Sequence, residues 1–276
     1  MYSVVILTLN EEQNLPACLA SLAGCNDIVV LDSGSTDRTQ AIAKAAGARV
    51  VERPFTNFAD QRNFAHAHVP FKNDWVFHLD ADEQMTLELH RECSSLAAQN
   101  PGGVDGFMVA PRMIYRNRWI PHCTDYPAYQ ARFAHARRFR FVQVGHGQRE
   151  DPSLRTGTLK GNYLHNLSAD TDAELEAKHR RYAVQEATAF LNRTPEPKTV
   201  WQSMLSSDKL VRRRALKLLS QQLPMRGLLR FCYQYLWRRG FLDGGAGLSY
   251  CLLLSRYESW IAAEIGRQRR TSQKNL

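Results

Sequence analysis

The sequence predicts an α/β fold with a mainly parallel sheet, followed by a mostly helical, basic C-terminal extension. Residues 1–100 alternate between short apolar segments and amphipathic ones, whereas residues 200–276 are rich in Leu, Arg and aromatic side chains. Alternation at this spacing is typical of βαβ units. We expect strands at 3–9, 27–31, 48–52 and 74–79, and helices at 11–22, 37–46, 57–67 and 86–98.

The composition is that of a globular protein, with 44% hydrophobic and 23% charged residues in a chain of 276. The chain opens on an apolar, strand-like segment and contains no run of about 18 apolar residues, so we expect neither a signal peptide nor a conventional membrane span. The six cysteines are scattered without a CxxC pair. This pattern favours reduced thiols in the cytoplasm over disulfides or a zinc site.

The middle of the chain has a different pattern of apolar and polar residues. Short alternating segments at 106–110, 128–133 and 139–144 predict further strands with long loops, which commonly carry a second substrate. A helix is expected at 173–192, and Pro195 and Pro197 then mark a break. We therefore expect a first domain at 1–195, whose two halves meet at about residue 100, and a helical region at 196–276.

Polar motifs follow the first two expected strands, where ligands bind in a parallel sheet. Thr8-Leu9-Asn10-Glu11-Glu12 ends the first strand, and Asn10 either contributes to a site or caps the next helix. The run from Asp32 to Asp37, Asp-Ser-Gly-Ser-Thr-Asp, ends the second strand. Its Ser33 and Gly34 permit a tight turn whose backbone N–H groups suit phosphate or ribose, although such turns are often purely structural.

The third motif places several carboxylates directly after an apolar strand. Asp80-Ala81-Asp82-Glu83 follows Trp75-Val76-Phe77-His78-Leu79. Carboxylates this close repel one another, and a bound divalent cation is the natural compensation. Mg²⁺ or Mn²⁺ takes one or two carboxylates plus phosphate oxygens, which fits a short Asp-x-Asp. The alternative is a solvated acidic loop, and Glu83 either joins the group or caps the following helix.

The combination of these motifs closely resembles the family-2 glycosyltransferases, together with the intervening segment 58–63, Phe-Ala-Asp-Gln-Arg-Asn. The resemblance is closest to the branch that builds lipopolysaccharide cores and other surface polysaccharides. It implies that residues 1–195 are a GT-A, Rossmann-like catalytic domain that binds a nucleotide sugar, with its donor half at about 1–100 and its acceptor half at about 101–195. It also implies an enzyme that inverts the anomeric centre. The donor residues it implies are Thr8, Asn10, Glu11, Asp32, Ser33, Gly34, Asp37, Arg62, Asp80 and Ala81, with Asp82, Asp80 and His165 around Mn²⁺ or Mg²⁺.

Such a transfer needs a carboxylate base for the acceptor hydroxyl. Relatives often carry a His-Glu or Glu-Asp pair in the region of residues 144–151, and here Gly147 follows His146. Glu150 and Asp151 are therefore the candidate bases, with Glu150 preferred, and an exposed charged loop is the alternative. Arg132 and Arg149 are candidates for holding phosphate or, equally, surface charges.

The C-terminal region carries an uneven basic charge. Nine Lys or Arg residues and no Asp or Glu lie between Lys209 and Arg239, against a net charge of +9 for the whole chain. Leu228, Leu229, Cys232, Tyr235 and Leu236 recur at helical spacing among arginines and aromatic residues. This pattern favours a helix lying on an anionic membrane surface. Packing on the catalytic domain or in a homo-oligomer is the alternative, and nucleic acid is not expected because no recognised module is present.

The sequence therefore predicts a peripheral enzyme at the inner face of the cell membrane. We expect it to move a sugar from a nucleotide diphosphate donor, UDP by the habit of the family, to a lipid-linked glycan or lipopolysaccharide-type acceptor. A nucleotidyltransferase is the alternative enzyme, but it calls for a glycine-rich basic loop after the first strand, where Leu9-Asn10-Glu11-Glu12 stands. A non-enzymatic membrane protein leaves the carboxylates unexplained.

Overall fold

The computed structural model describes residues 1–144, 147–167, 172–192, 205 and 225–274. Contacts divide the chain into two compact units: Met1–Trp119 with Asp125–Ala169, and Ile120–Thr124 with Asp170–Leu276. The short segment Ile120–Thr124 thus leaves the first unit and packs within the second.

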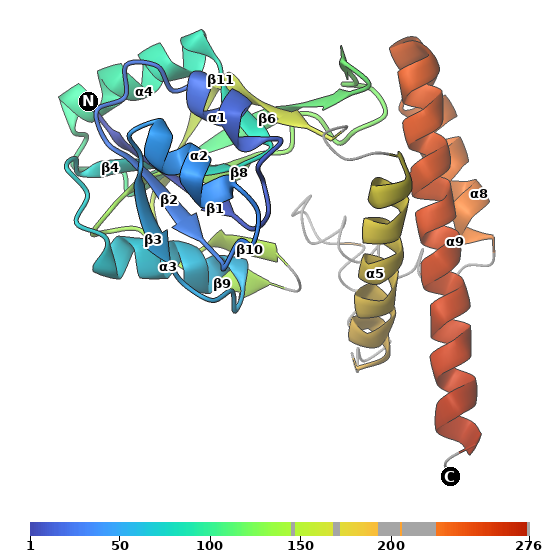
Figure 1. Ribbon diagram of the computed structural model, residues 1–276. Helices are drawn as coiled ribbons and strands as arrows, with labels where there is room; N and C mark the ends of the chain where they lie inside the picture. Colours follow the sequence, from blue (N-terminus) through green and yellow to red (C-terminus); the bar gives the residue numbers. More distant parts are fainter. Residues whose placement is uncertain (145–146, 168–171, 193–204, 206–224, 275–276) are drawn as a thin grey trace. The chain divides into compact units, whose positions relative to one another are not determined.

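Nine strands of the described residues form one sheet in the first unit, in the order β3-β2-β1-β4-β8-β6-β11-β5 with β7 paired to β6 (Figure 1). Strands β1 to β4 are parallel, as the alternation predicted. The others are mixed: β8 runs antiparallel to both β4 and β6, and β11 runs parallel to β6. The bounds are β1 Ser3–Thr8, β2 Ile28–Asp32, β3 Arg49–Glu52, β4 Trp75–Asp80, β5 Glu83–Met85, β6 Gly106–Tyr115, β7 Arg118–Trp119, β8 Gln130–His135 and β11 Thr156–Asn166.

Helices cover both faces of the parallel part because its strands are apolar on both sides. Val4 and Ile6 of β1 pack in one core with helices α1, α2 and α4. Val5, between them in sequence, packs in a second core that includes Ala65 of α3. Period-two alternation therefore divides β1 between two helical layers. The helices are α1 Leu15–Ala20, α2 Thr39–Ala45, α3 Phe58–His68 and α4 Leu87–Gln99.

The sheet curls, which brings its last strand, β5, back to the loop that follows β4 in the middle of the strand order. Strand β5 begins three residues after β4 ends, yet β5 pairs with β11 at the far end of the strand order. A separate antiparallel pair, β9 (Phe141–Val144) and β10 (Gly147–Glu150), contacts α3. The first unit is therefore a mixed α/β sheet curled around the end of β4.

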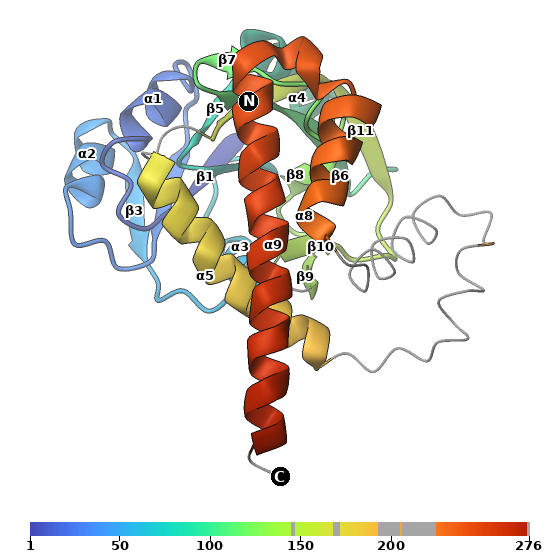
Figure 2. The ribbon, with the colours of Figure 1, turned by 90° about the vertical axis from the view of Figure 1, so that its right-hand side faces the viewer.

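The second unit is helical. Helix α5 (Asp172–Leu191) and helix α8 (Arg226–Phe231) both pack on the long helix α9 (Gly244–Lys274), as Figure 2 shows. A π-helical turn, η1 (Cys232–Trp237), and a 3₁₀ turn, η2 (Gly240–Asp243), connect α8 to α9. The domain expected at residues 1–195 includes α5, whereas the contacts of α5 group it with the C-terminal helices. The boundary expected at residue 195 lies outside the described residues.

Two local expectations differ from the structure. Helix α1 begins at Leu15 instead of residue 11, so Asn10 does not cap it; Asn10 adopts a left-handed conformation in the loop before the helix. The helix expected through residue 236 is present, but its second half is π-helical. Within the described residues, no helix is both long enough and apolar enough to cross a membrane.

Candidate functional site

The loop after β2 is organised around the carboxylate of Asp32. This side chain is fully buried, and its two oxygens accept five hydrogen bonds, from the Thr8 hydroxyl, the Gln40 amide and three donors of the turn at Gly34 and Ser35. Burial alone would raise the pKa of Asp32, but these hydrogen bonds outweigh it and lower the pKa. Asp32 therefore stays ionised, with its oxygens engaged by the protein.

The loops after β1 and β2 interlock through side chains that accept backbone hydrogen bonds. Asn10 Oδ1 accepts from the Thr36 N–H at 2.8 Å, and the Asn10 N–H donates to the Ser35 hydroxyl at 2.8 Å. Asp37 accepts from the backbone N–H groups of Glu12 and Thr39. The motifs after the first two strands thus form one rigid surface at the carboxyl edge of the parallel strands, where ligands of such sheets bind.

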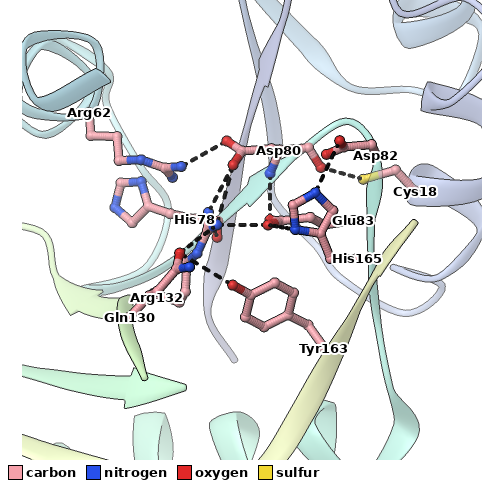
Figure 3. A network of polar contacts seen from close by, with 10 residues as sticks. All are labelled: Cys18, Arg62, His78, Asp80, Asp82, Glu83, Gln130, Arg132, Tyr163 and His165. Carbon is pink, nitrogen blue, oxygen red and sulfur yellow. Dashed lines mark hydrogen bonds and ion pairs between the residues drawn. The ribbon is translucent and has the colours of Figure 1, made fainter. Parts of the chain in front are cut away.

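Asp80, at the end of β4, lies between two buried arginines (Figure 3). Arg62 of α3 donates to its Oδ1 at 2.7 Å, and Arg132 of β8 approaches its Oδ2 at 3.3 Å. Burial opposes ionisation, but the two guanidinium groups outweigh it and lower the pKa of Asp80 to about 2. Nε and Nη1 of Arg62 are buried without a hydrogen-bond partner, so the cation is incompletely satisfied by the protein.

A β-bulge aims Arg132 into the site. Phe107 and Met108 of β6 are consecutive, but they pair with Phe133 and Ala131 of β8, so Arg132 has no residue opposite it. An extra residue of this kind re-aims its side chain away from the regular alternation. Arg132 contacts Asp80, lies over the Tyr163 ring at 5.1 Å and donates to Glu83 at 2.7 Å. The bulge therefore links β8 to both carboxylates.

Asp82, Glu83 and His165 form a group whose ligand atoms lie within 4.8 Å of one another. Asp82 Oδ2 is 3.2 Å from His165 Nε2, and Glu83 Oε1 is 3.7 Å from His165 Nδ1. Burial opposes the charge of His165, but Asp82, Glu83 and Asp80 outweigh it and raise the pKa of His165 to about 9. For Glu83, burial is the largest effect, and it raises the pKa to about 7 despite Arg132.

Two carboxylates and an imidazole fit Mn²⁺, and carboxylates alone fit Mg²⁺. The donors differ in how far the protein already uses them. Glu83 is fully buried and accepts from both Arg132 and the backbone N–H of Asp80. The Asp82 side chain is 24% exposed, and among the described residues its carboxylate pairs with His165. Asp82 and His165 are thus the residues best placed to ligate an ion, while Asp80 is engaged by arginines.

The two candidate bases occupy different environments. Glu150 lies opposite Phe141 in the β9–β10 pair, so the two side chains share a face of that ribbon. The Phe141 ring lies 5.9 Å from the guanidinium of Arg62, which places this face toward the Arg62–Asp80 pair. Asp151 instead caps its own turn, because its Oδ1 accepts from the N–H and hydroxyl of Ser153.

The remaining predicted residues divide between the site and its supports. Ser33 accepts from Gln61 of α3, Ala81 is buried, and Arg149 lies on β10. His146 lies outside the described residues. From the sequence, Glu83 either joins the metal group or caps the following helix; in the structure Thr86 caps α4, and Glu83 is buried in β5. Tyr163 and Gln61 were not predicted as site residues, and their signal was proximity to His165 and Arg62 in the sequence.

The chain belongs to the glycosyl transferase family 2, whose model matches residues 3–148. This match contains both interlocked loops, the Arg62–Asp80 pair and the carboxylates after β4. The resemblance seen in the motifs is thereby confirmed, as is the GT-A α/β fold with a helical C-terminal region.

Two curated relatives indicate how far the similarity extends. The chain is 34% identical over 121 residues to an uncharacterised glycosyltransferase of Rickettsia bellii, covering 43% of this chain and 40% of that protein. It is 32% identical over 151 residues to the lipopolysaccharide core biosynthesis glycosyltransferase LpsC of Rhizobium meliloti, covering 53% and 52%. The chain thus spans about half or less of these relatives.

Among solved structures, the chain is similar to the mannosyltransferase PcManGT of Pyrobaculum calidifontis in complex with GDP-Man and Mn²⁺. The identity is 15% and the TM-score 0.49, over 96% of this chain and 86% of that one. It is also similar to TarS of S. aureus in complex with UDP-GlcNAc, at 15% identity and a TM-score of 0.44, over 98% and 92%.

Proposed function

We propose that this protein is an inverting, metal-dependent glycosyltransferase that moves a sugar from a nucleotide diphosphate donor to a lipid-linked glycan. The observation that carries the proposal is the arrangement after β4, where Asp82 and His165 lie 3.2 Å apart beside the Arg62–Asp80 pair. Family membership supplies the reaction class, and the resemblance implies UDP as the nucleotide.

The donor side uses the rigid edge formed by the first two loops. Asp32, Asn10 and Asp37 hold the loops after β1 and β2 in one arrangement, which presents Glu11 and the turn at Ser33 and Gly34 to the nucleotide, while the buried Thr8 supports Asp32. Arg62 orients Asp80 and provides positive charge next to the diphosphate. Because these groups are fixed before the donor binds, they stabilise developing charge with little reorganisation.

A divalent ion held by Asp82 and His165 would supply charge stabilisation to the leaving diphosphate. Glu83 supports this site indirectly, since Arg132 and the Asp80 backbone already use its oxygens. Glu150 is the proposed base that accepts the proton of the acceptor hydroxyl. The hydrogen bonds of Asp151 to Ser153 support the choice of Glu150 over Asp151.

Association with an anionic membrane is the second part of the proposal, and the inverted polarity of residues 226–242 supports it. Polar Arg226 and Gln234 are buried: Arg226 bonds Glu258 at 2.6 Å, and Gln234 donates to the Cys123 carbonyl at 2.9 Å. Large apolar side chains point outward instead. The exposed ones are Leu228, Leu229, Tyr233, Leu236, Trp237, Phe241 and Leu242.

This surface has the charge that anionic lipid requires. Arg230, Arg238 and Arg239 accompany the exposed apolar residues, and the nearby acid, Asp243, is buried against His122 and the Cys123 N–H. Trp237 is 81% exposed, which is costly in water but suits the interface between headgroups and acyl chains. A lipid-linked acceptor would meet the enzyme at such a membrane.

The proposed activity is tested with a panel of UDP-, GDP-, CDP- and dTDP-sugars and the full chain. We expect one donor class to be hydrolysed slowly in the presence of Mn²⁺ or Mg²⁺, with loss of hydrolysis after chelation and recovery on adding the ion back. A flat response to every donor contradicts the proposal. Release of pyrophosphate from a nucleoside triphosphate and a sugar phosphate would indicate a nucleotidyltransferase instead.

A further inference from the structure

A hairpin of the first unit carries basic and aromatic side chains that the proposed reaction does not use. Strands β6 and β7 are joined by Arg116 and Asn117, both with positive φ, in a tight two-residue turn. Arg112, Arg116 and Arg118 are exposed on this hairpin, and residues 106–124 contain no Asp or Glu. The hairpin is therefore a locally basic surface.

Trp119 lies at the end of this hairpin, in a cluster that fixes its ring. The guanidinium of Arg112 lies over the ring at 5.1 Å, and Tyr126 packs edge-on against it at 5.3 Å. Asn162 of β11 holds both neighbours, since its Oδ1 accepts from Arg112 Nε at 3.1 Å and from the Tyr126 hydroxyl at 3.3 Å. The Trp119 ring nevertheless remains 39% exposed.

The sheet register relates this cluster to the proposed metal ligands. Trp119 pairs with Ile114 of β6, Ile114 pairs with Asn166 of β11, and the Asn166 N–H donates to the carbonyl of Asp82 at 3.0 Å. Neighbouring strands are about 4.8 Å apart, so the backbone of Trp119 lies about 14 Å from that of Asp82 along this row. The Trp119 side chain shares a face with Asn166, whereas His165 points to the other face, so a glycan that contacts both sites passes over the carboxyl ends of β6 and β11. That separation exceeds the length of a single sugar ring.

We propose that Trp119 and Arg112 form a remote acceptor subsite, which binds a sugar unit of an anionic oligosaccharide beyond the unit that reacts. This inference rests on the proposed function. An exposed, immobilised indole offers a flat apolar surface for the C–H face of a sugar ring. Arg112 provides a planar fork for a phosphate or carboxylate on the same glycan, and Arg116 and Arg118 add to the local positive charge.

The test compares a monosaccharide phosphate with oligosaccharides released from lipopolysaccharide cores, in native form and after removal of phosphate. For Trp119→Ala we expect the KM of the native oligosaccharide to rise about tenfold with little change in kcat. Hydrolysis of the donor and transfer to the monosaccharide phosphate remain within about twofold. Trp119→Phe, which keeps an aromatic face, recovers most of the affinity.

Arg112→Ala tests the anionic contact without removing the aromatic ring. Removing phosphate from the oligosaccharide weakens its binding to the wild-type chain, and the same removal has little effect on Arg112→Ala. Arg91→Ala, at an exposed arginine of α4, is the matched control and behaves like wild type. Equal effects of Trp119→Ala on short and long acceptors overturn the subsite, as does the failure of every oligosaccharide to bind. If the wild-type chain hydrolyses no donor, the proposed function is contradicted instead.

Discussion

Arg62 and Asp80 form an ion pair in which the arginine is almost fully buried and the carboxylate is 31% exposed. The pair joins α3 to the end of β4, and Arg132 reaches the same carboxylate from β8. Arg132 also pairs with Glu83 at 2.7 Å, so the two arginines are matched by two carboxylates. These ion pairs give the arginines a structural role, which stability measurements can separate from donor binding.

Replacing Asp82 tests the metal assignment. We expect Asp82→Ala to lose donor turnover by at least a hundredfold, because charge stabilisation of the leaving group is lost. The free energy of unfolding changes by less than about 1 kcal/mol, since the side chain is partly exposed. Turnover is followed by nucleotide release and metal affinity by Mn²⁺ titration. Glu88→Gln, at an exposed acid of α4, is the control. Unchanged turnover in Asp82→Ala would show that this carboxylate is not needed.

Substituting each acid by its amide distinguishes the roles of Glu150 and Asp151. Glu150→Gln should lower kcat of transfer about 10²- to 10⁴-fold while leaving the KM of the donor nearly unchanged, because a base acts on the acceptor. Asp151→Asn should keep most activity and lose a little stability, because Ser153 loses a charged acceptor. Steady-state kinetics over pH 5–9 distinguish the two. A larger loss for Asp151→Asn would reverse the assignment.

The buried pair should matter more for stability than a similar exposed pair. Arg62→Met leaves Asp80 with Arg132, which it shares with Glu83, as its remaining arginine, and we expect a loss of about 3 kcal/mol. Arg53→Met breaks the Arg53–Asp60 pair, which is more exposed, and should cost less than about 1 kcal/mol. Urea denaturation measures both. Equal losses of unfolding free energy in the two variants would indicate that burial of the pair does not determine the effect of breaking it.

Asp27 should make the free energy of unfolding of the first unit depend on pH in the acid range. Burial would raise its pKa, but hydrogen bonds from Ser3, the Lys72 N–H and Arg49 outweigh it and lower the pKa. A carboxylate with a depressed folded-state pKa stabilises the protein above its unfolded pKa, about 3.9, and loses that contribution as pH falls through the folded pKa. Asp27→Asn should therefore cost about 2 kcal/mol at pH 7 and progressively less below about pH 4.

Denaturation of Asp27→Asn and wild type at several pH values between 3 and 7 checks this convergence. A difference that stays constant over the whole range would mean that the ionised form contributes nothing.

Trp237 should act as a membrane anchor. Trp237→Ala should weaken binding to vesicles of phosphatidylglycerol and phosphatidylcholine about 30-fold, as expected for loss of about 2 kcal/mol of apolar burial. Arg239→Gln should weaken it about fivefold, and only at low salt, because the contribution of each surface arginine is about 1 kcal/mol and is screened. Phe55→Ala, an exposed aromatic residue of the first unit, is the control. Equal binding by all variants at both salt concentrations contradicts a membrane surface here.

The local parts of the fold could be predicted from the sequence. Strands β1 to β4 and helices α2 to α4 begin and end within about two residues of expectation, because apolar periodicity is a local signal. Helix α1 was predicted too long, since the Asn10 side chain accepts from the Thr36 N–H and the Glu11 N–H donates to the Thr39 hydroxyl at the start of α2.

The partners of the site residues could not be predicted in this way. The sequence by itself determined that carboxylates follow β4 and that family-2 motifs precede them. Only the tertiary structure decided that Asp80 lies between Arg62 and Arg132 and that Asp82 lies beside His165, because a bulge in β8 and the curl of the sheet bring together residues far apart in the chain. It also decided which face of residues 226–242 is outward. A helical period shows that a face exists, and burial of Arg226 and Gln234 shows that the apolar face is the exposed one.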